Sequence, residues 1–142
     1  MRKLLLLCAA LFVAAHVPFL PASLGDLDSI NFALAVREFD VAANQPHPPG
    51  YPIYVGVAKL ATAALYRAGD PLNAAHALAL VNIVGGALAL IAVFALARAL
   101  DYAPRSALAA AAVAATVPLF WFSASRPLSD LLALASAVAA PA

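Results

Sequence analysis

The sequence predicts an all-α integral membrane protein with polytopic helices, and three observations predict it. Of the 142 residues, 65% are hydrophobic, whereas soluble domains have about 45–50% apolar residues. Charged residues make up 11%, compared with about 25% in soluble domains. Long apolar runs also approach the roughly 20 residues that a membrane-spanning helix needs. This composition excludes both an ordinary water-soluble globule and a disordered chain.

Charge and cysteine content exclude further classes. Eight Lys and Arg residues against seven Asp and Glu give a net charge of +1, so no nucleic-acid partner is expected. Cys8 is the single cysteine and cannot form an intrachain disulfide. No Cys/His cluster indicates a zinc site, and no metal ligand or certain cofactor is assigned. Asp26 and Asp28 have the spacing of a metal-binding motif, but two carboxylates alone do not predict a cation site, so a bound divalent cation stays an alternative.

The first expected span covers about residues 4–21 and follows Arg2 and Lys3. Its charge and length suit either a retained membrane anchor or a cleaved signal peptide. Pro18 and Pro21, which lie beside the possible cleavage site, favour the retained anchor.

A polar loop, residues 23–75, follows this span. It holds five of the seven acids: Asp26, Asp28, Glu38, Asp40 and Asp70. Asp28 is expected to cap a helix over about 29–41, because Asp is a preferred N-cap and apolar residues follow it. Between 44 and 52 the prolines exclude a helix, since they remove backbone donors and restrict the backbone.

A second loop helix is expected over about 52–67. Pro52 suits the first helical position, where its missing N–H has no cost. Lys59, Arg67 and the tyrosines make this segment less apolar than a span. We therefore expect an amphipathic helix that lies in the membrane interface and ends near Gly69-Asp70-Pro71.

Three further apolar segments complete the chain. Residues 77–97 carry no charge, and residues 106–123 end in the aromatic group Phe120-Trp121-Phe122. The last segment, 128–142, is too short to span a bilayer. The chain is therefore expected to be the N-terminal part of one larger membrane domain. The alternative is a small complete protein whose last helix lies in the interface.

The basic residues of the short loops predict the orientation. Arg2 and Lys3 precede the first span, and Arg98 and Arg105 lie between the second and third. If each segment crosses once, both groups share one side, which the positive-inside rule makes cytoplasmic. The N-terminus is then cytoplasmic and loop 23–75 faces outside.

The order of these features resembles a known enzyme superfamily. An acidic helix start is followed by His47-Pro48-Pro49-Gly50-Tyr51-Pro52-Ile53-Tyr54, then by paired spans. This pattern resembles the N-terminal part of C-type (GT-C) membrane glycosyltransferases, which include protein O-mannosyltransferases and aminoarabinose transferases. It looks most like the bacterial DUF2723-like branch. The resemblance implies transfer of a sugar from a polyprenyl-phosphate donor to an unidentified acceptor, at the outer face of a bacterial inner (plasma) membrane.

By position, the resemblance implies that Asp28 is the catalytic base. Asp28-Ser29-Ile30-Asn31-Phe32 corresponds to the related pattern Gly-Asp-Ser-Gly-Glu-Phe. Asp26, which follows the glycine, is the rival base. Asn31 stands where relatives often have a second acid, which argues against a role for two adjacent carboxylates.

Glycosyl transfer needs a base for the acceptor proton and cations or amides for the departing phosphate. The residues expected to bind substrate are His47, Tyr51, Tyr54, Lys59, Arg126 and Asp130. All of these except Lys59 also have a purely structural interpretation. The histidine could order the proline turn, the tyrosines could anchor the interface, and Arg126 could pair with Asp130.

Two other functions remain open: a transporter subunit, and a small non-catalytic membrane or assembly protein. A transporter needs ionisable residues inside its spans, but 77–97 has only Asn82 as a strongly polar residue. Gly85-Gly86 in the same segment predicts close helix contact and not a site.

Overall fold

A computed structural model describes residues 1–69 and 73–142, and its regular elements in that part of the chain are all helices. The all-α prediction is therefore confirmed for these residues. The helices are α1 (Arg2–His16), α2 (Leu27–Arg37), α3 (Pro52–Arg67), α4 (Asn73–Ala99), α5 (Pro104–Thr116), α6 (Pro118–Ala124) and α7 (Asp130–Ala139). Short 3-10 turns cover Val17–Phe19 and Val41–Ala43.

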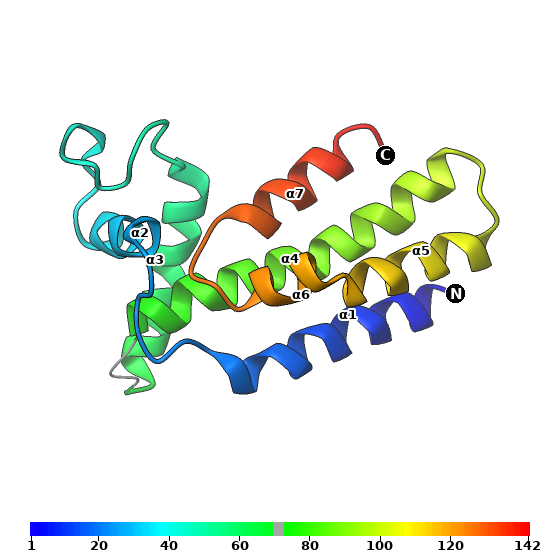
Figure 1. Cartoon of the computed structure of the whole chain (residues 1–142), viewed down its shortest axis with the longest axis horizontal. Coiled ribbons are helices and arrows are strands. Elements are labelled where there is room, and N and C mark those ends of the chain that lie inside the picture. Colours follow the sequence, from blue (N-terminus) through cyan, green and yellow to red (C-terminus); the bar gives the residue numbers. More distant parts are fainter. Residues whose placement is uncertain (70–72) are drawn as a thin grey trace.

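Helix α4 is the centre of the molecule. Helices α1, α5 and α7 run along it, and this group is called the bundle below (Figure 1). Helices α2 and α3 and the loop between them, residues 27–67, gather at the other end of the molecule from the N-terminus and are called the head. Helix α3 crosses the direction of α4 instead of continuing it (Figure 1).

Two helical segments, Arg2–Phe19 and Ala74–Ala99, are long and apolar enough to cross a membrane. Helices α5 and α6 form a third candidate only when they are counted together, because their axes differ by 64°. The single span expected over 106–123 is thus a broken one. Pro118 explains the break: it disfavours helical backbone at Val117, whose ψ of 126° is extended.

The small residues of α4 allow its neighbours to approach closely, as Gly85-Gly86 predicted. A Cβ on Gly85 would lie 2.6 Å from the backbone nitrogen of Leu132 on α7. A Cβ on Gly86 would lie 2.7 Å from the ring of Phe12 on α1. Because neither glycine has a side chain, α7 and α1 can pack directly against the backbone of α4.

The start of α2 differs from the predicted helix over 29–41 with Asp28 as its N-cap. The N-cap is Asp26 and not Asp28, and the helix covers Leu27–Arg37 and not 29–41. Asp26 Oδ1 accepts the Ser29 N–H at 2.8 Å, which completes a capping box with the Ser29 hydroxyl. Asp28 lies in the first turn instead. Helix α3 covers the residues expected for it, whereas the stop signal at Asp70-Pro71 lies outside the described residues.

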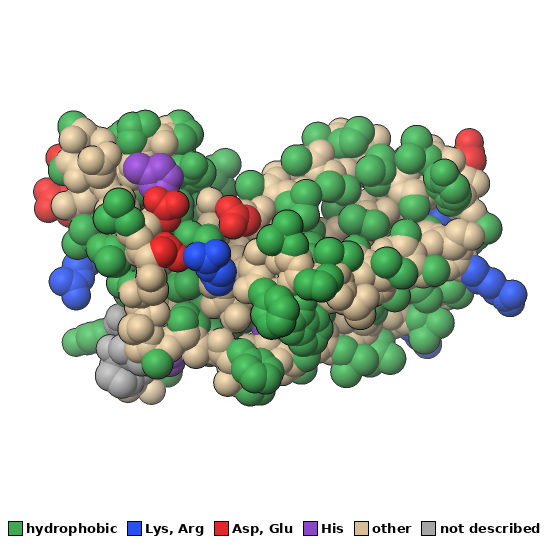
Figure 2. All heavy atoms as spheres, viewed as in Figure 1, with side chains coloured by type: hydrophobic (Ala, Val, Ile, Leu, Met, Phe, Trp, Pro, Cys, Tyr) green, Lys and Arg blue, Asp and Glu red, His purple; other side chains and the backbone are tan. Residues whose placement is uncertain are grey.

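Charged side chains concentrate at the two ends of the molecule. In Figure 2 the middle of the visible face is mainly hydrophobic, while acidic, basic and histidine side chains gather over the head. The N-terminus and the α4–α5 connection lie together at the opposite end (Figure 1), which brings Arg2 and Lys3 to the same end as Arg98 and Arg105. The structure thus has an apolar middle between two polar ends.

Candidate functional site

Asp28 and His47 come together on the head. Asp28 Oδ1 lies 3.6 Å from His47 Nδ1, and the two side chains are 60% and 28% exposed. This distance exceeds the usual N–H···O range of about 2.7–3.2 Å, so the contact is an ion pair only when His47 is protonated. His47 Nδ1 is itself buried and makes no hydrogen bond in the described structure. The pair therefore joins an accessible carboxylate to an imidazole whose Nδ1 has no other partner.

An aromatic cluster holds His47 in this place. The ring of Phe32 on α2 lies 5.5 Å from that of His47, 5.2 Å from Tyr51 and 4.9 Å from Tyr54. The two tyrosine pairs are edge-on and the His47 pair is tilted, and aromatic pairs at such distances stabilise by about 0.5–1.5 kcal/mol each. Phe32 therefore ties α2, the proline loop and the start of α3 into one unit.

The backbone of the proline loop depends on left-handed residues. Gly50 has φ +97°, and a Cβ there would lie 2.9 Å from Val41, so both conformation and space require glycine. Tyr51 has φ 46° and precedes α3 directly. This strained tyrosine is held by its ring contacts with Phe32 and His47. The order of the His-Pro-Pro-Gly-Tyr-Pro string thus specifies one particular turn.

Asp26 pairs with Arg126, a hundred residues further along the chain. Arg126 donates to Asp26 Oδ2 at 2.8 Å and so ties the start of α2 to the α6–α7 turn. Burial raises the pKa of Asp26, but the Ser29 N–H and the Arg126 guanidinium outweigh burial and leave that pKa below its usual value. The expected alternative, a pair between Arg126 and Asp130, is not the one that forms.

Asn82 on α4 positions the turn that carries Arg126 and Asp130. Its buried amide donates to the carbonyl oxygens of Ser123 at 2.8 Å and of Arg126 at 3.2 Å. Its Oδ1 accepts the Leu131 N–H at 2.9 Å. Sequence reasoning did not include Asn82 in the site, although a lone strongly polar residue in an apolar span was the available signal.

Tyr51 and Tyr54 border a small cavity between α3 and α7, whereas Asp130 lines a different cavity together with Phe120 and Ser123. The cavity holds about 220 Å³ and is lined by Tyr51, Pro52, Ile53, Tyr54, Ser129, Leu132, Ala133 and Ser136. Burial, with a smaller contribution from Asp130, raises the pKa of Tyr54, whose hydroxyl donates to Leu78 O at 3.3 Å. Tyr54 therefore stays protonated. The volume lies below the roughly 300–1,000 Å³ of pockets for drug-sized ligands, so the cavity has room for one small group.

Lys59 is not brought to Asp28 and His47. It lines a different groove together with Arg37, at the end of α2 opposite Asp28. The nine residues from Asp28 to Arg37 correspond to about 13 Å along the helix. The structure thus gathers Asp28, His47 and Tyr51 in one place, with Tyr54 beside them, and leaves Lys59 apart.

The acids of the head do not form a metal centre. Among residues 1–69 and 73–142, no group of three His, Cys, Asp or Glu side chains is placed to hold a metal ion. Asp26 is already engaged by Ser29 and Arg126. The two carboxylates of the Asp26-x-Asp28 sequence thus serve different partners.

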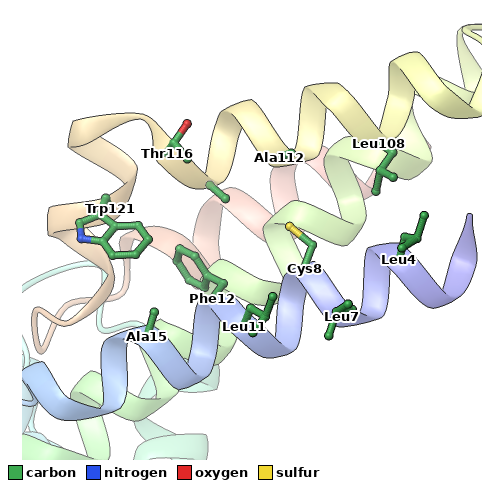
Figure 3. Close-up of a pocket in the computed structure, with 11 residues that line it drawn as sticks. Leu4, Leu7, Cys8, Leu11, Phe12, Ala15, Leu108, Ala112, Thr116 and Trp121 are labelled. Atoms are coloured by element: carbon green, nitrogen blue, oxygen red, sulfur yellow. The ribbon is translucent and has the colours of Figure 1, made fainter.

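An apolar cavity of about 510 Å³ lies between α1 and α5, away from the head. Leu4, Leu7, Cys8 and Leu11 line one side, Leu108, Ala112 and Thr116 line the other, and Trp121 and Phe12 close one end (Figure 3). No acidic or basic side chain lines it, so it offers no acid–base chemistry. The ionisable groups suited to such chemistry lie on the head instead.

Comparisons of the chain with protein-family models, with curated proteins and with solved structures find no match.

Proposed function

We propose that the head supplies the proton-accepting site of a membrane glycosyltransferase that uses a polyprenyl-phosphate sugar, with Asp28 as the base. One observation carries the proposal: an exposed carboxylate lies 3.6 Å from a histidine fixed by the His-Pro-Pro-Gly-Tyr-Pro turn, at the polar end of an apolar helical bundle. A lipid-linked donor and a water-borne acceptor meet at such a boundary.

The surroundings of the two acids favour Asp28 over its rival Asp26 as the base. Both oxygens of Asp26 are engaged, by Ser29 and by Arg126, and its pKa lies below the usual value. A carboxylate that is stabilised as an anion in this way accepts a proton poorly. Asp28 has a single described charged partner, His47, and 60% of its side chain is open to an approaching hydroxyl.

The reaction balances with these groups. Asp28 takes the proton of the acceptor hydroxyl while the acceptor oxygen forms a bond to the anomeric carbon. The bond from that carbon to the phosphate oxygen breaks, and the polyprenyl phosphate leaves with the electron pair. Protonated Asp28 then returns its proton to water.

Arg126 is the cation best placed for the departing phosphate. Arg126 contacts Asp26, which is two residues before the proposed base Asp28 in the sequence, and 55% of the Arg126 side chain is exposed. A guanidinium can bind a phosphate through two parallel hydrogen bonds. The small cavity beside Tyr51 and Tyr54 would take part of the sugar, since tyrosine rings offer an apolar face and a polar tip.

The proposed orientation places the head outside the bacterial inner membrane and the N-terminus in the cytoplasm. The basic residues support it, because Arg2, Lys3, Arg98 and Arg105 lie at the end opposite the head. In this orientation α3 lies in the outer membrane interface.

Turnover of the full chain in sealed right-side-out vesicles tests the proposal. A labelled short-chain polyprenyl-phosphate sugar is added outside, and release of the polyprenyl phosphate is measured. Asp28→Asn should lower the rate by a factor of about 10²–10⁴, the usual contribution of a positioned base. Glu38→Gln, a matched change of an exposed acid on the head, should leave it unaltered.

Full turnover in Asp28→Asn would exclude this base. Turnover that appears only after the vesicles are opened would reverse the orientation. If the chain consumes no donor at all, that result favours the alternative of a non-catalytic membrane or assembly protein. The apolar cavity between α1 and α5 would then suit a helix of a partner protein (Figure 3). A transporter is less favoured, because Asn82 is used up in bonds to backbone groups.

A further inference from the structure

A second polar surface lies on the head, on the groove that Lys59 shares with Arg37. The groove holds about 480 Å³ between the end of α2 and the second half of α3. Its lining includes Val36, Arg37, Lys59, Thr62, Tyr66 and Arg67. Three of the lining residues, Arg37, Lys59 and Arg67, are cations, and none of the described lining residues is an acid. The groove therefore concentrates positive charge on a chain whose net charge is only +1.

Helix stability explains only part of this charge. Arg37 and Arg67 lie in the last turns of α2 and α3, where the helix dipole favours a cation. Lys59 lies in the middle of α3 and has no such role. Lys59 therefore adds a positive charge that helix stability does not explain, and three cations around one groove favour a ligand that carries negative charge.

The neighbouring face of α3 identifies the kind of molecule that would bring this negative charge. Ile53, Val57 and Leu60 recur at helical spacing, and 78%, 42% and 74% of their surfaces are exposed. Tyr66, which lines the groove, is 74% exposed. Exposed apolar residues beside cations on one helix are typical of a helix that binds the surface of an anionic membrane.

We propose that this groove binds the phosphate of an acidic membrane phospholipid, with Arg37, Lys59 and Arg67 facing the phosphate. The acyl chains would then run along Ile53, Val57 and Leu60. The site lies at the far end of α2 from Asp28 and does not depend on the proposed transferase activity.

Lipid binding to the full chain in detergent micelles tests the proposal, with native mass spectrometry as the readout. Phosphatidylglycerol should bind several-fold more tightly than phosphatidylcholine. Lys59→Gln/Arg67→Gln should weaken phosphatidylglycerol binding by roughly fivefold for each charge removed. Lys3→Gln/Arg105→Gln removes the same charge from the opposite end and serves as the matched control.

Three outcomes would overturn the proposal. Equal binding of phosphatidylcholine would show that the groove does not select negative charge. Equal weakening in the Lys3→Gln/Arg105→Gln control would show attraction to the whole protein and not to this groove. Displacement of the lipid by inorganic phosphate as effective as by short-chain phosphatidylglycerol would assign the groove to a free phosphate. Helical circular dichroism of each variant shows whether the fold is retained, which is expected because the substituted cations are exposed.

Discussion

The bundle and the head are held together by different means. In the bundle, α4 presents fully buried alanines, and Gly85 and Gly86 let α7 and α1 approach closely. In the head, the large ring of Phe32 binds α2, the proline loop and α3 into one unit. Small residues thus allow the close approach of α7 and α1 to α4, whereas the connection between α2, the proline loop and α3 depends on one large ring.

The two regions also treat polar groups differently. Asn82 in the bundle uses both ends of its amide on backbone groups. Asp28 in the head has 60% of its side chain exposed. A buried polar group in an apolar region must be satisfied internally, whereas a surface group can keep capacity for a ligand. Available chemistry is therefore expected in the head and not in the bundle.

The largest expected effect comes from removing the polar centre of the bundle. Asn82→Ala leaves the buried N–H of Leu131 without its partner. The carbonyls of Ser123 and Arg126 lose the Asn82 amide but keep the backbone N–H groups of Arg126 and Leu128. An unsatisfied buried group costs about 1–3 kcal/mol and a lost hydrogen bond about 0.5–1.5 kcal/mol, so we expect a loss of about 3 kcal/mol in the free energy of unfolding. Unfolding in mixed micelles with rising dodecyl sulfate, followed by helical circular dichroism, measures it.

Ser136→Ala is the matched control for Asn82→Ala. The Ser136 hydroxyl donates only to Leu132 O within its own helix and is exposed. Its removal should change the free energy of unfolding by less than about 0.5 kcal/mol. A similarly small loss in Asn82→Ala would contradict the central role of this amide.

The second prediction compares one substitution in both regions. Gly85→Ala places a Cβ 2.6 Å from backbone that cannot easily move and should lower the free energy of unfolding by about 2 kcal/mol. Gly56→Ala, on α3 in the head, meets nothing within 4 Å and should raise it by roughly 1 kcal/mol through helix propensity. The same micelle titration measures both. Changes of equal sign would show that close packing does not distinguish the bundle from the head.

Much of the fold could be predicted from local chemistry. Pro52 fixed the start of α3, and the glycine pair in α4 predicted close contact. Two errors had readable signals: Asp26 and Ser29 have the spacing of a capping box, and Pro118 interrupts the segment 106–123. Both errors arose because apolar content was given more weight than these local signals.

The candidate site was less predictable, because it depends on how distant segments meet. His47 lies near Asp28 only because Phe32 packs under the proline loop. The pairing of Asp26 with Arg126 joins residues a hundred positions apart, and no local pattern specifies it. Lys59 lies apart from Asp28 because it lines a groove at the other end of α2, together with Arg37. A single sequence carries no direct signal for such relations.

The smallest expected effect concerns the ion pair that joins head and bundle. Arg126→Gln removes the guanidinium from Asp26, in a pair whose two side chains are 55% and 31% exposed. Because exposed pairs contribute little, we expect the free energy of unfolding to fall by less than about 1 kcal/mol near neutral pH.

The pKa of Asp26 is lowered in the folded protein, so the stabilisation by its ionised form is present above the usual pKa of 3.8 and is lost as the pH falls through the folded-state pKa. The difference between the wild type and Arg126→Gln should therefore vanish once the pH lies below the folded-state pKa of Asp26, where the carboxyl is protonated. NMR titration of Asp26 should also show a higher pKa in Arg126→Gln, while Arg105→Gln at the opposite end should leave it unchanged. An unaltered Asp26 titration in Arg126→Gln would show that head and bundle are not coupled through this pair, and that the capping box alone holds the acid ionised.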